Sequence, residues 1–191
     1  MSKNSLRKRI KNKRNSLTKP EMQKQSSLIL KQFKGLMYDI VDSKGGFVVY
    51  LATQSEVKTA GIINFLHKQN RKVYAPCVTN SEITPSCLTK GCKFKKCEFD
   101  IYEPEKKSKI RSLKNIAAVI IPGIAFDTRG NRLGFGKGFF DKFLKKLPEK
   151  TLKIALAFSC QIVKQVPAEA HDVKMDFIIT ENGIYECTEA Q

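Results

Sequence analysis

The sequence predicts an α/β fold with a layered, mainly parallel sheet flanked by helices. Short apolar runs rich in β-branched residues recur along the chain, and segments with the periodicity of amphipathic helices separate them. Such alternation is typical of strand–helix units that share one sheet. A third observation is the glycine-rich stretch 121–141, which lies between a strongly apolar run and a helical pattern.

Two helices are expected near the N-terminus. The first is basic and amphipathic, with Leu6, Ile10 and Leu17 as its apolar stripe. The second starts at residues 18–21, where a threonine, an early proline and a glutamate form a capping signal, and it ends at Gly35. We expect this basic region, residues 2–34, to pack on the α/β core.

The predicted sheet has five strands. They span residues 46–51, 72–76, 116–121, 152–158 and 177–180. A helix carrying Val57, Ile62, Ile63 and Leu66 follows the first strand. Residues 78–112 fit the alternation poorly, and we expect a β-hairpin excursion there at the sheet edge. The sequence contains no repeat or domain boundary, so residues 1–191 are expected to form a single domain.

The chain is strongly basic, with a net charge of +17 from 35 Lys and Arg against 18 Asp and Glu. Such an excess predicts attraction to polyanions: nucleic acid, nucleotides or a polycarboxylate substrate. The alternative is a set of solvated helix faces in a lysine-rich protein. The sequence has no apolar run long enough to span a membrane and no signal peptide at its start, so we expect a cytoplasmic protein.

Six cysteines are expected to be reduced thiols in that compartment. Cys87, Cys92 and Cys97 recur every five residues, which raises the alternative of a structural zinc site. A C-x-x-C pair is missing, and His67 and His171 are distant in sequence, so the thiol interpretation is favoured.

The glycine-rich stretch is the strongest functional candidate. Its five glycines are Gly123, Gly130, Gly134, Gly136 and Gly138. A glycine loop that opens a helix presents backbone N–H groups to an anion, phosphate above all. Arg132 and Lys137 add positive charge, and Asp141 is placed to hold a divalent cation against phosphates. The spacing matches neither a Walker loop nor a dinucleotide fingerprint, and the alternative is that the glycines only make tight turns.

Ligands of parallel sheets bind beyond the carboxyl ends of the strands. That rule gathers loops that are far apart in sequence, and it predicts one cleft lined by charged residues. These are Glu56, Arg132, Lys137, Asp141 and Asp172. For Asp172 an ordinary charged loop is an equal alternative.

The stretch P-G-I-A-F-D-T-R-G-N-R-L-G-F-G-K-G-F-F-D, residues 122–141, resembles the signature of the 5-formyltetrahydrofolate cyclo-ligases, also called methenyltetrahydrofolate synthetases. Three further segments resemble the same family in the same order. They are K-N-S-L-R at 3–7, L-A-T-Q-S-E-V at 51–57, and V-P-A-E-A-H-D at 166–172 with I-I-T-E at 178–181. The resemblance therefore covers nearly the whole chain.

The resemblance implies an ATP-driven cyclisation of 5-formyltetrahydrofolate to 5,10-methenyltetrahydrofolate. In this family ATP phosphorylates the formyl oxygen, the neighbouring anilino nitrogen attacks that carbon, and phosphate leaves with ADP as the second product. The implied ligands are ATP, Mg²⁺ and a reduced folate with or without a polyglutamate tail. We expect a monomer with neither a nucleic-acid nor a membrane partner.

The resemblance also assigns roles to positions of this chain. Lys137 and Arg132 match the catalytic positions. The ATP-binding positions are Lys3, Arg7, Arg132, Leu133, Gly134, Phe135, Gly136, Lys137, Gly138, Phe139 and Phe140. The folate-binding positions are Leu51, Glu56, Phe135, Gly136, Lys137, Gly138 and Phe139. Asp141 and Asp172 match the magnesium positions.

The chain departs from the family pattern at three of these positions. Phe139 and Phe140 stand where two tyrosines are usual, which removes any contact made by a hydroxyl group. Phe135 stands where an arginine is frequent, which removes one phosphate contact.

Two other classes compete with this interpretation. A nucleic-acid-binding protein would explain the charge, but the sequence has no RNA-binding or helix-turn-helix signature. Another small-molecule phosphotransferase could use the same glycine-rich loop.

Overall fold

A computed structural model describes residues 1–40, 45–97, 102–108, 110, 112–169 and 171–187. Its centre is a seven-stranded sheet with the order β11-β10-β9-β6-β1-β2-β3. Those strands are β1 (Gly46–Val49), β2 (Val73–Thr79), β3 (Glu82–Leu88), β6 (Ile116–Ile121), β9 (Leu152–Leu156), β10 (Phe177–Thr180) and β11 (Gly183–Glu186). The helices are α1 (Lys3–Asn15), α2 (Lys19–Ile40), α3 (Ala60–Lys68) and α4 (Phe139–Leu144). Two short hairpins, β4 (Phe94–Lys96) with β5 (Tyr102–Pro104) and β7 (Ala125–Phe126) with β8 (Arg132–Leu133), complete the strands.

The five inner strands β10, β9, β6, β1 and β2 are parallel, and both edge strands are antiparallel. The predicted mainly parallel α/β sheet is therefore confirmed, and its five predicted strands are the five parallel ones. The edge strands β3 and β11 and the hairpin β7–β8 were not resolved as separate strands by the sequence patterns. Each is two to seven residues long.

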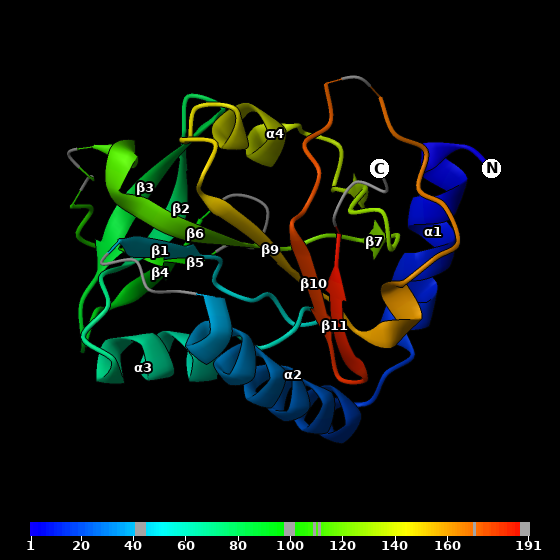
Figure 1. Ribbon diagram of the computed structural model, residues 1–191, viewed down its shortest axis with the longest axis horizontal. Helices are drawn as coiled ribbons and strands as arrows, with labels where there is room; N and C mark the ends of the chain where they lie inside the picture. Colours follow the sequence, from blue (N-terminus) through cyan, green and yellow to red (C-terminus); the bar gives the residue numbers. More distant parts are fainter. Residues whose placement is uncertain (41–44, 98–101, 109, 111, 170, 188–191) are drawn as a thin grey trace.

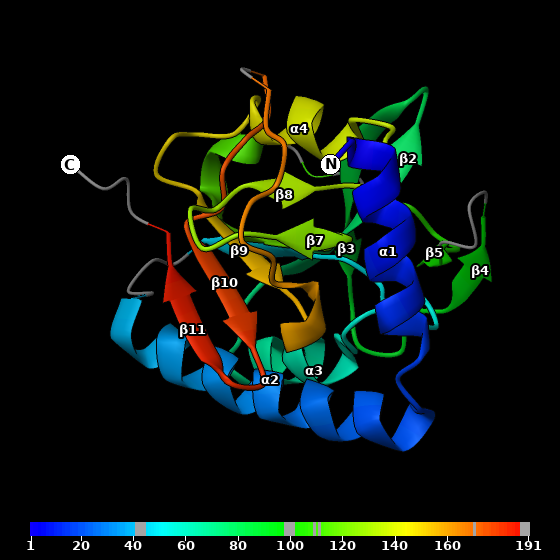
Figure 2. The same cartoon turned by 90° about the vertical axis from the view of Figure 1, so that its right-hand side faces the viewer.

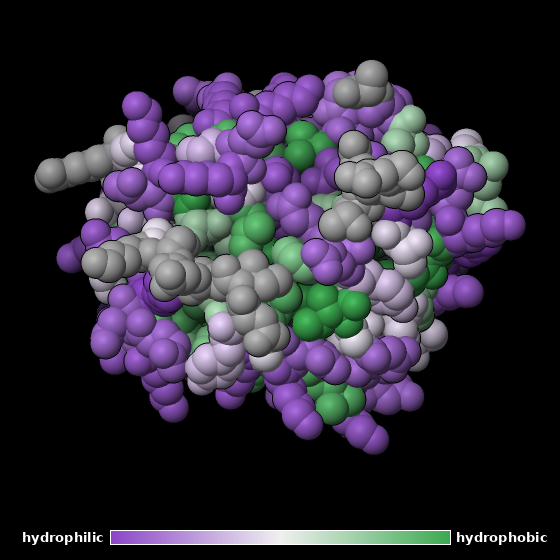
Figure 3. Space-filling model, viewed as in Figure 1, coloured by the Kyte–Doolittle hydropathy of each residue, from purple (hydrophilic) through white to green (hydrophobic). Residues whose placement is uncertain are grey.

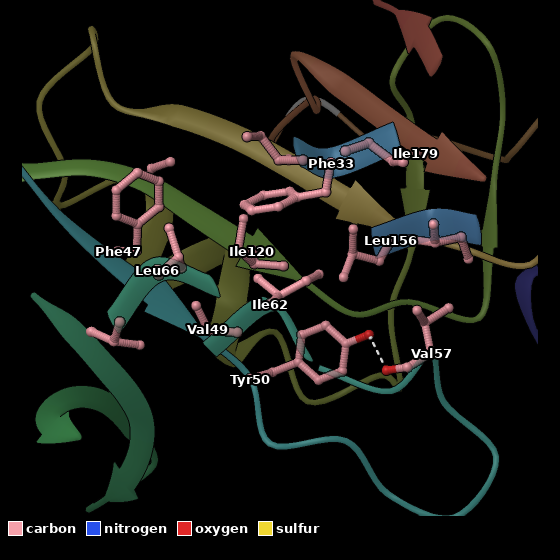
Figure 4. Close-up of a cluster of buried hydrophobic side chains, with 14 of the residues drawn as sticks. Phe33, Phe47, Val49, Tyr50, Val57, Ile62, Leu66, Ile120, Leu156 and Ile179 are labelled. Atoms are coloured by element: carbon pink, nitrogen blue, oxygen red, sulfur yellow. Dashed lines mark hydrogen bonds between the residues drawn. The ribbon is translucent and has the colours of Figure 1, made fainter. Parts of the chain in front are cut away.

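Helices cover both faces of the sheet (Figure 1). On one face, α2 and α3 bury Phe33 and Leu66 against strand residues such as Phe47 and Ile120, as Figure 4 shows. On the other face, α4 buries Phe143 and Leu144. The apolar runs in β1 and β6 are consequently buried on both sides, as expected for parallel strands.

Helix α1 lies beside the β7–β8 hairpin rather than over the main sheet (Figure 2). Leu6 and Ile10 join Ile124, Ala125 and Leu133 in a third, smaller core cluster. The stripe predicted for this helix was wrong at its C-terminal end. Leu17 lies beyond the helix, and the buried position one turn after Ile10 is Arg14.

Helix α2 does not end at Gly35, as the sequence suggested, but continues to Ile40. Its start is as predicted, since Thr18 and Glu21 exchange the hydrogen bonds of a capping box. A glycine inside a helix costs only about 1 kcal/mol relative to alanine. Burial of Leu36 and Met37 outweighs that cost, and the helix therefore runs through.

The excursion predicted around residues 78–112 is confirmed as a region of hairpins. Its first hairpin includes all of β2, which begins before residue 78. Strand β2 extends to Thr79 and turns back into β3 through Asn80 and Ser81, both with positive φ. The second hairpin, β4–β5, follows. Residues 98–101, 109 and 111 of the predicted region lie outside the described residues.

The face of the molecule shown in Figure 3 is mostly hydrophilic, with small separate apolar areas. Among the described residues, no helix is both long and apolar enough to cross a bilayer. All six cysteines are unpaired thiols, as expected. Within the described part of the chain, no group of three His, Cys, Asp or Glu residues is arranged to hold a metal ion.

Candidate active site along helix α1

The glycine-rich stretch folds differently from the simple strand-to-helix loop that the sequence suggested. The β7–β8 hairpin is inserted before the helix. Asp127, fully buried at its turn, accepts hydrogen bonds from the backbone N–H groups of Arg129, Asn131 and Val166. One carboxylate thus holds the hairpin turn and ties it to the segment after β9. Sequence reasoning gave Asp127 no role, although it lies in the quoted motif.

Three glycines of this stretch have positive φ, which L side chains rarely adopt: Gly130 at 83°, Gly136 at 101° and Gly138 at 67°. At Gly130 a Cβ atom would also lie 2.5 Å from the Met175 carbonyl oxygen. Gly138 is the N-cap of α4, which has only six residues. These glycines therefore make turns, and the turns bring the loop backbone against α1.

An ion pair spans the loop. Arg132 Nη2 donates to Asp141 Oδ1 at 2.7 Å, and both side chains are largely buried. The Arg132 guanidinium carbon also lies 5.8 Å from the centre of the Phe140 ring, within cation–π range. Lys137, by contrast, lies at the exposed tip of the loop.

Helix α1 presents a row of four cations, Lys3, Arg7, Lys11 and Arg14, which we call the cationic row. The spacings of four, four and three residues place them on one helix face. Arg7 Nε donates to the Gly134 carbonyl oxygen at 3.0 Å, which docks the glycine-rich loop on the helix. Lys11 and Arg14 lie 5.8 and 6.0 Å from the centre of the Phe135 ring.

The N-terminal end of the cationic row contacts the segment before β10. Lys3 Nζ lies 3.1 Å from Asp172 Oδ2 and 2.8 Å from Glu169 Oε1. Burial opposes the charge on Asp172, but the Glu169 backbone N–H and the Lys3 ammonium outweigh it and hold the pKa of Asp172 below its usual value. Asp172 is therefore not an unattached charged loop residue.

The C-terminal end of the row reaches a recess between the loops after β1, β6 and β9. Its polar lining residues are Arg14, Glu56 and Gln161. Glu56 Oε2 accepts from the Thr53 backbone N–H at 2.8 Å, and Gln161 donates to the carbonyl oxygens of Gly123 and Ile124. Burial lowers the pKa of Arg14, and the charge on Glu56 partly offsets that effect. The recess as it stands has no room even for a water molecule, so a ring system must widen it before it can bind there.

Four of the five charged residues that topology predicted around one cleft lie at successive contacts along α1. Asp172 lies at Lys3, the ion pair of Arg132 and Asp141 flanks the loop held by Arg7, and Glu56 lies in the recess of Arg14. Lys3 and Arg14 are eleven residues apart on one helix, a rise of about 16 Å.

A family model described as the 5-formyltetrahydrofolate cyclo-ligase family matches residues 1–181. The chain belongs to that family. A mouse 5-formyltetrahydrofolate cyclo-ligase is 28% identical over 95% of this chain and 95% of its own length. The solved 5,10-methenyltetrahydrofolate synthetase of Aquifex aeolicus superposes with a TM-score of 0.82 at 27% identity, covering 100% of this chain and 95% of that one. A 5,10-methenyltetrahydrofolate synthetase of Mycoplasma pneumoniae superposes with a TM-score of 0.74 at 25% identity, covering 95% of this chain and 99% of that one.

The departures of this cyclo-ligase family member from the usual pattern have defined surroundings. Phe139 and Phe140 are half-buried against the core cluster under α4, and Phe140 also faces Arg132. Phe135 is 49% exposed and lies over the cationic row. The aromatic ring thus contacts cations at a position where the family resemblance led us to expect an arginine.

Sequence reasoning about this family member missed three buried polar residues: Arg14, Asp127 and Gln161. Each connects segments that are distant in sequence. Arg14 had a readable signal, because it continues the i, i+4 spacing of Leu6 and Ile10 into the buried face. The sequence alone contains no comparable pattern for Gln161. Leu51, a predicted folate contact, is half-buried and packs against the main core cluster.

Proposed function

We propose that this chain catalyses the ATP-dependent cyclisation of 5-formyltetrahydrofolate to 5,10-methenyltetrahydrofolate, with release of ADP and phosphate. Family membership supports the folate reaction. ATP dependence and a phosphorylated formyl intermediate are supported above all by one observation: the glycine-rich loop is docked, through Arg7 and Gly134, on a row of four cations. Such a row suits an extended polyanion better than a single small anion.

The two ends of the row suggest how the substrates lie. Arg132 and Lys137 would neutralise the phosphoryl group in transit, and Lys3 and Arg7 would hold the rest of the triphosphate. Glu56 and Leu51 would contact the pterin, with the Glu56 carboxylate accepting from its N–H groups. The backbone from Gly134 to Phe140, including Gly136 and Gly138, would lie between the two substrates.

The proposed reaction has two bond exchanges. The formyl oxygen attacks the γ-phosphorus, the bond between that phosphorus and the bridging oxygen breaks, and ADP leaves. The N10 nitrogen then attacks the activated formyl carbon and loses its proton, and the carbon–oxygen bond breaks to release phosphate. Neither exchange needs a nucleophile from the protein, so the side chains act by orientation and charge.

These residues suit a magnesium ion that binds together with ATP better than one coordinated by protein ligands alone. Asp141 and Asp172 would hold it, but each is also bonded to a cation, Arg132 and Lys3. Mg²⁺ is usually bound by one or two carboxylates together with substrate phosphates, and there it would neutralise phosphate charge. We further propose a cytoplasmic monomer of one domain whose basic surface tolerates a polyglutamate tail.

The test follows the absorbance of the methenyl product in the near ultraviolet, with purified protein, 5-formyltetrahydrofolate and Mg-ATP. One ADP and one phosphate should form for each product molecule. With ¹⁸O in the formyl group, the label should appear in the released phosphate. Unlabelled phosphate would exclude the phosphorylated formyl intermediate, and product formation without ATP would exclude the energetic coupling.

A further inference from the structure

Arg14 is the most deeply buried cation of the cationic row, with 4% of its surface exposed. Its Nη2 donates to Ser55 Oγ at 3.0 Å and its Nη1 to the Gly123 carbonyl oxygen at 3.4 Å. Among the described residues, Arg14 Nε is buried without any hydrogen-bond partner. Buried guanidinium donors are rarely left unsatisfied, because the desolvation penalty is not recovered. The spare donor therefore indicates a group that the protein itself does not supply.

The position of Arg14 restricts what that group can be. Arg14 and Glu56 line the same recess, and only 6% of the surface of Glu56 is exposed. Glu56 offers only acceptors and Arg14 only donors. The recess therefore suits a flat molecule whose edge carries donors beside an acceptor.

The pterin ring of a folate carries that pattern. Its 2-amino group and N3–H are adjacent donors, and the next ring position, C4, carries a carbonyl oxygen. We infer that Arg14 binds the C4 carbonyl of the pterin while Glu56 accepts from the adjacent N–H groups, which makes Arg14 a substrate-specificity residue. This inference rests on the proposed function, and it deepens that function by naming the residue that binds the C4 carbonyl of the substrate.

The same arrangement gives Phe135 a role at the recess. Its ring lies 6.0 Å from the Arg14 guanidinium and is about half exposed. A pterin entering beside Arg14 would meet this ring and stack on it or displace it.

The experiment compares two inhibitors that differ at C4 and at the adjacent N3: a 2-amino-4-oxo-tetrahydropteridine, whose N3 carries a hydrogen, and its 2,4-diamino counterpart, whose N3 does not. The 4-amino group replaces the acceptor with a donor that would oppose Arg14. For the wild-type protein we expect the inhibition constant of the 4-oxo compound to be about 10–100-fold lower, as for a hydrogen bond to a charged group. In Arg14→Met this preference should fall about tenfold, leaving the part that is due to N3–H and Glu56, with a raised KM for the folate and little change in the KM for ATP.

Arg9→Met is the matched control, since Arg9 lies on the exposed face of the same helix. It should keep the full preference. If Arg14→Met does not fold, Arg14→Lys decides, because it keeps the charge but loses the fork of donors. A variant that folds and keeps the wild-type preference would overturn the assignment while the cyclisation itself stands. If the wild-type protein binds neither of the two pteridines and does not cyclise the folate, the proposed function is overturned instead.

Discussion

Arg132 on β8 and Asp141 on α4 are joined by an ion pair of 2.7 Å that closes the glycine-rich loop at its base. Only seven residues separate the end of β8 at Leu133 from Asp141, and they include Gly134, Gly136 and Gly138. The pair fixes both ends of a segment whose own sequence gives it little rigidity. The loop is therefore held in shape before any ligand binds.

Asp141→Asn should destabilise the protein by about 1–3 kcal/mol, because it leaves the buried Arg132 charge without its partner. For a chain of this size that corresponds to a fall in melting temperature of roughly 3–10 °C. The same variant should need more Mg²⁺ to use ATP. The control is Glu82→Gln, which breaks an exposed ion pair with Lys146 of the same 2.7 Å length and should change stability much less, because solvent screens that pair. Equal melting temperatures and Mg²⁺ titrations for Asp141→Asn and wild type would contradict both roles.

Lys137→Ala should remove most turnover and leave the melting temperature unchanged. The side chain is exposed at the tip of the loop, so the fold does not depend on its burial, whereas the transferring phosphoryl group does depend on nearby charge. Steady-state rates and thermal unfolding measure the two effects separately. Lys142→Ala, an exposed lysine on α4, serves as the control and should retain the wild-type rate. A rate near wild type for Lys137→Ala would show that the lysine is not catalytic.

The contact between Lys3 and Asp172 should contribute stability over a defined pH range. Burial alone would raise the pKa of Asp172, but its hydrogen bonds outweigh that effect and hold the pKa below the usual 3.8. Burial alone would lower the pKa of Lys3, but Glu169 and Asp172 outweigh that effect and hold the pKa above the usual 10.5. The Asp172 contribution is thus present above its unfolded pKa of about 3.9 and lost as pH falls through the lower folded value. The Lys3 contribution is complete below its unfolded pKa of about 10.4 and lost as pH rises through the higher folded value.

Lys3→Met should accordingly be less stable than wild type by about 0.5–1 kcal/mol between these limits, with the difference shrinking at either extreme. Urea unfolding across the pH range measures this difference, and Lys8→Met, at an exposed position of α1, should show none. A difference that vanishes near neutral pH would contradict the ion pair.

Phe139→Tyr should change turnover only modestly, because a neutral hydrogen bond contributes about 0.5–1.5 kcal/mol. Phe139→Ala should weaken folate binding more than ATP binding if the ring stacks on the pterin. The ring also packs partly against the core under α4, so the alanine variant should lose stability as well. Separate binding titrations of the two ligands distinguish these effects. Equal losses of both affinities would assign Phe139 to the core alone.

The sequence predicted elements whose signals are local. The parallel strands stood out because both of their faces are buried, as in Ile116–Ile121, and Thr18 with Glu21 marked the start of α2. The elements that it missed depend on distant contacts. Hairpin β7–β8 is fixed to the rest of the fold by the hydrogen bond from the Val166 backbone N–H to Asp127, and α2 passes Gly35 because the sheet lies beneath it.

The same division holds for the candidate site. The glycine-rich motif and its charges were readable, and the pairing of Arg132 with Asp141 falls within one stretch of sequence. The arrangement along α1 was not readable, because it requires knowing which face of α1 meets the loops. Arg14 on that face contacts Ser55 and Gly123, 41 and 109 positions away.

The attachment of α1 has a consequence for biosynthesis. Lys3 emerges among the first residues of the growing chain, but its partner Asp172 is added 169 positions later. At typical translation rates of 5–20 residues per second, the helix waits roughly 10–30 s for the segment that anchors it. The helix with its four cations is therefore made first but anchored at Lys3 only late, and a chain that stops before Asp172 would carry the glycine-rich loop without that anchor.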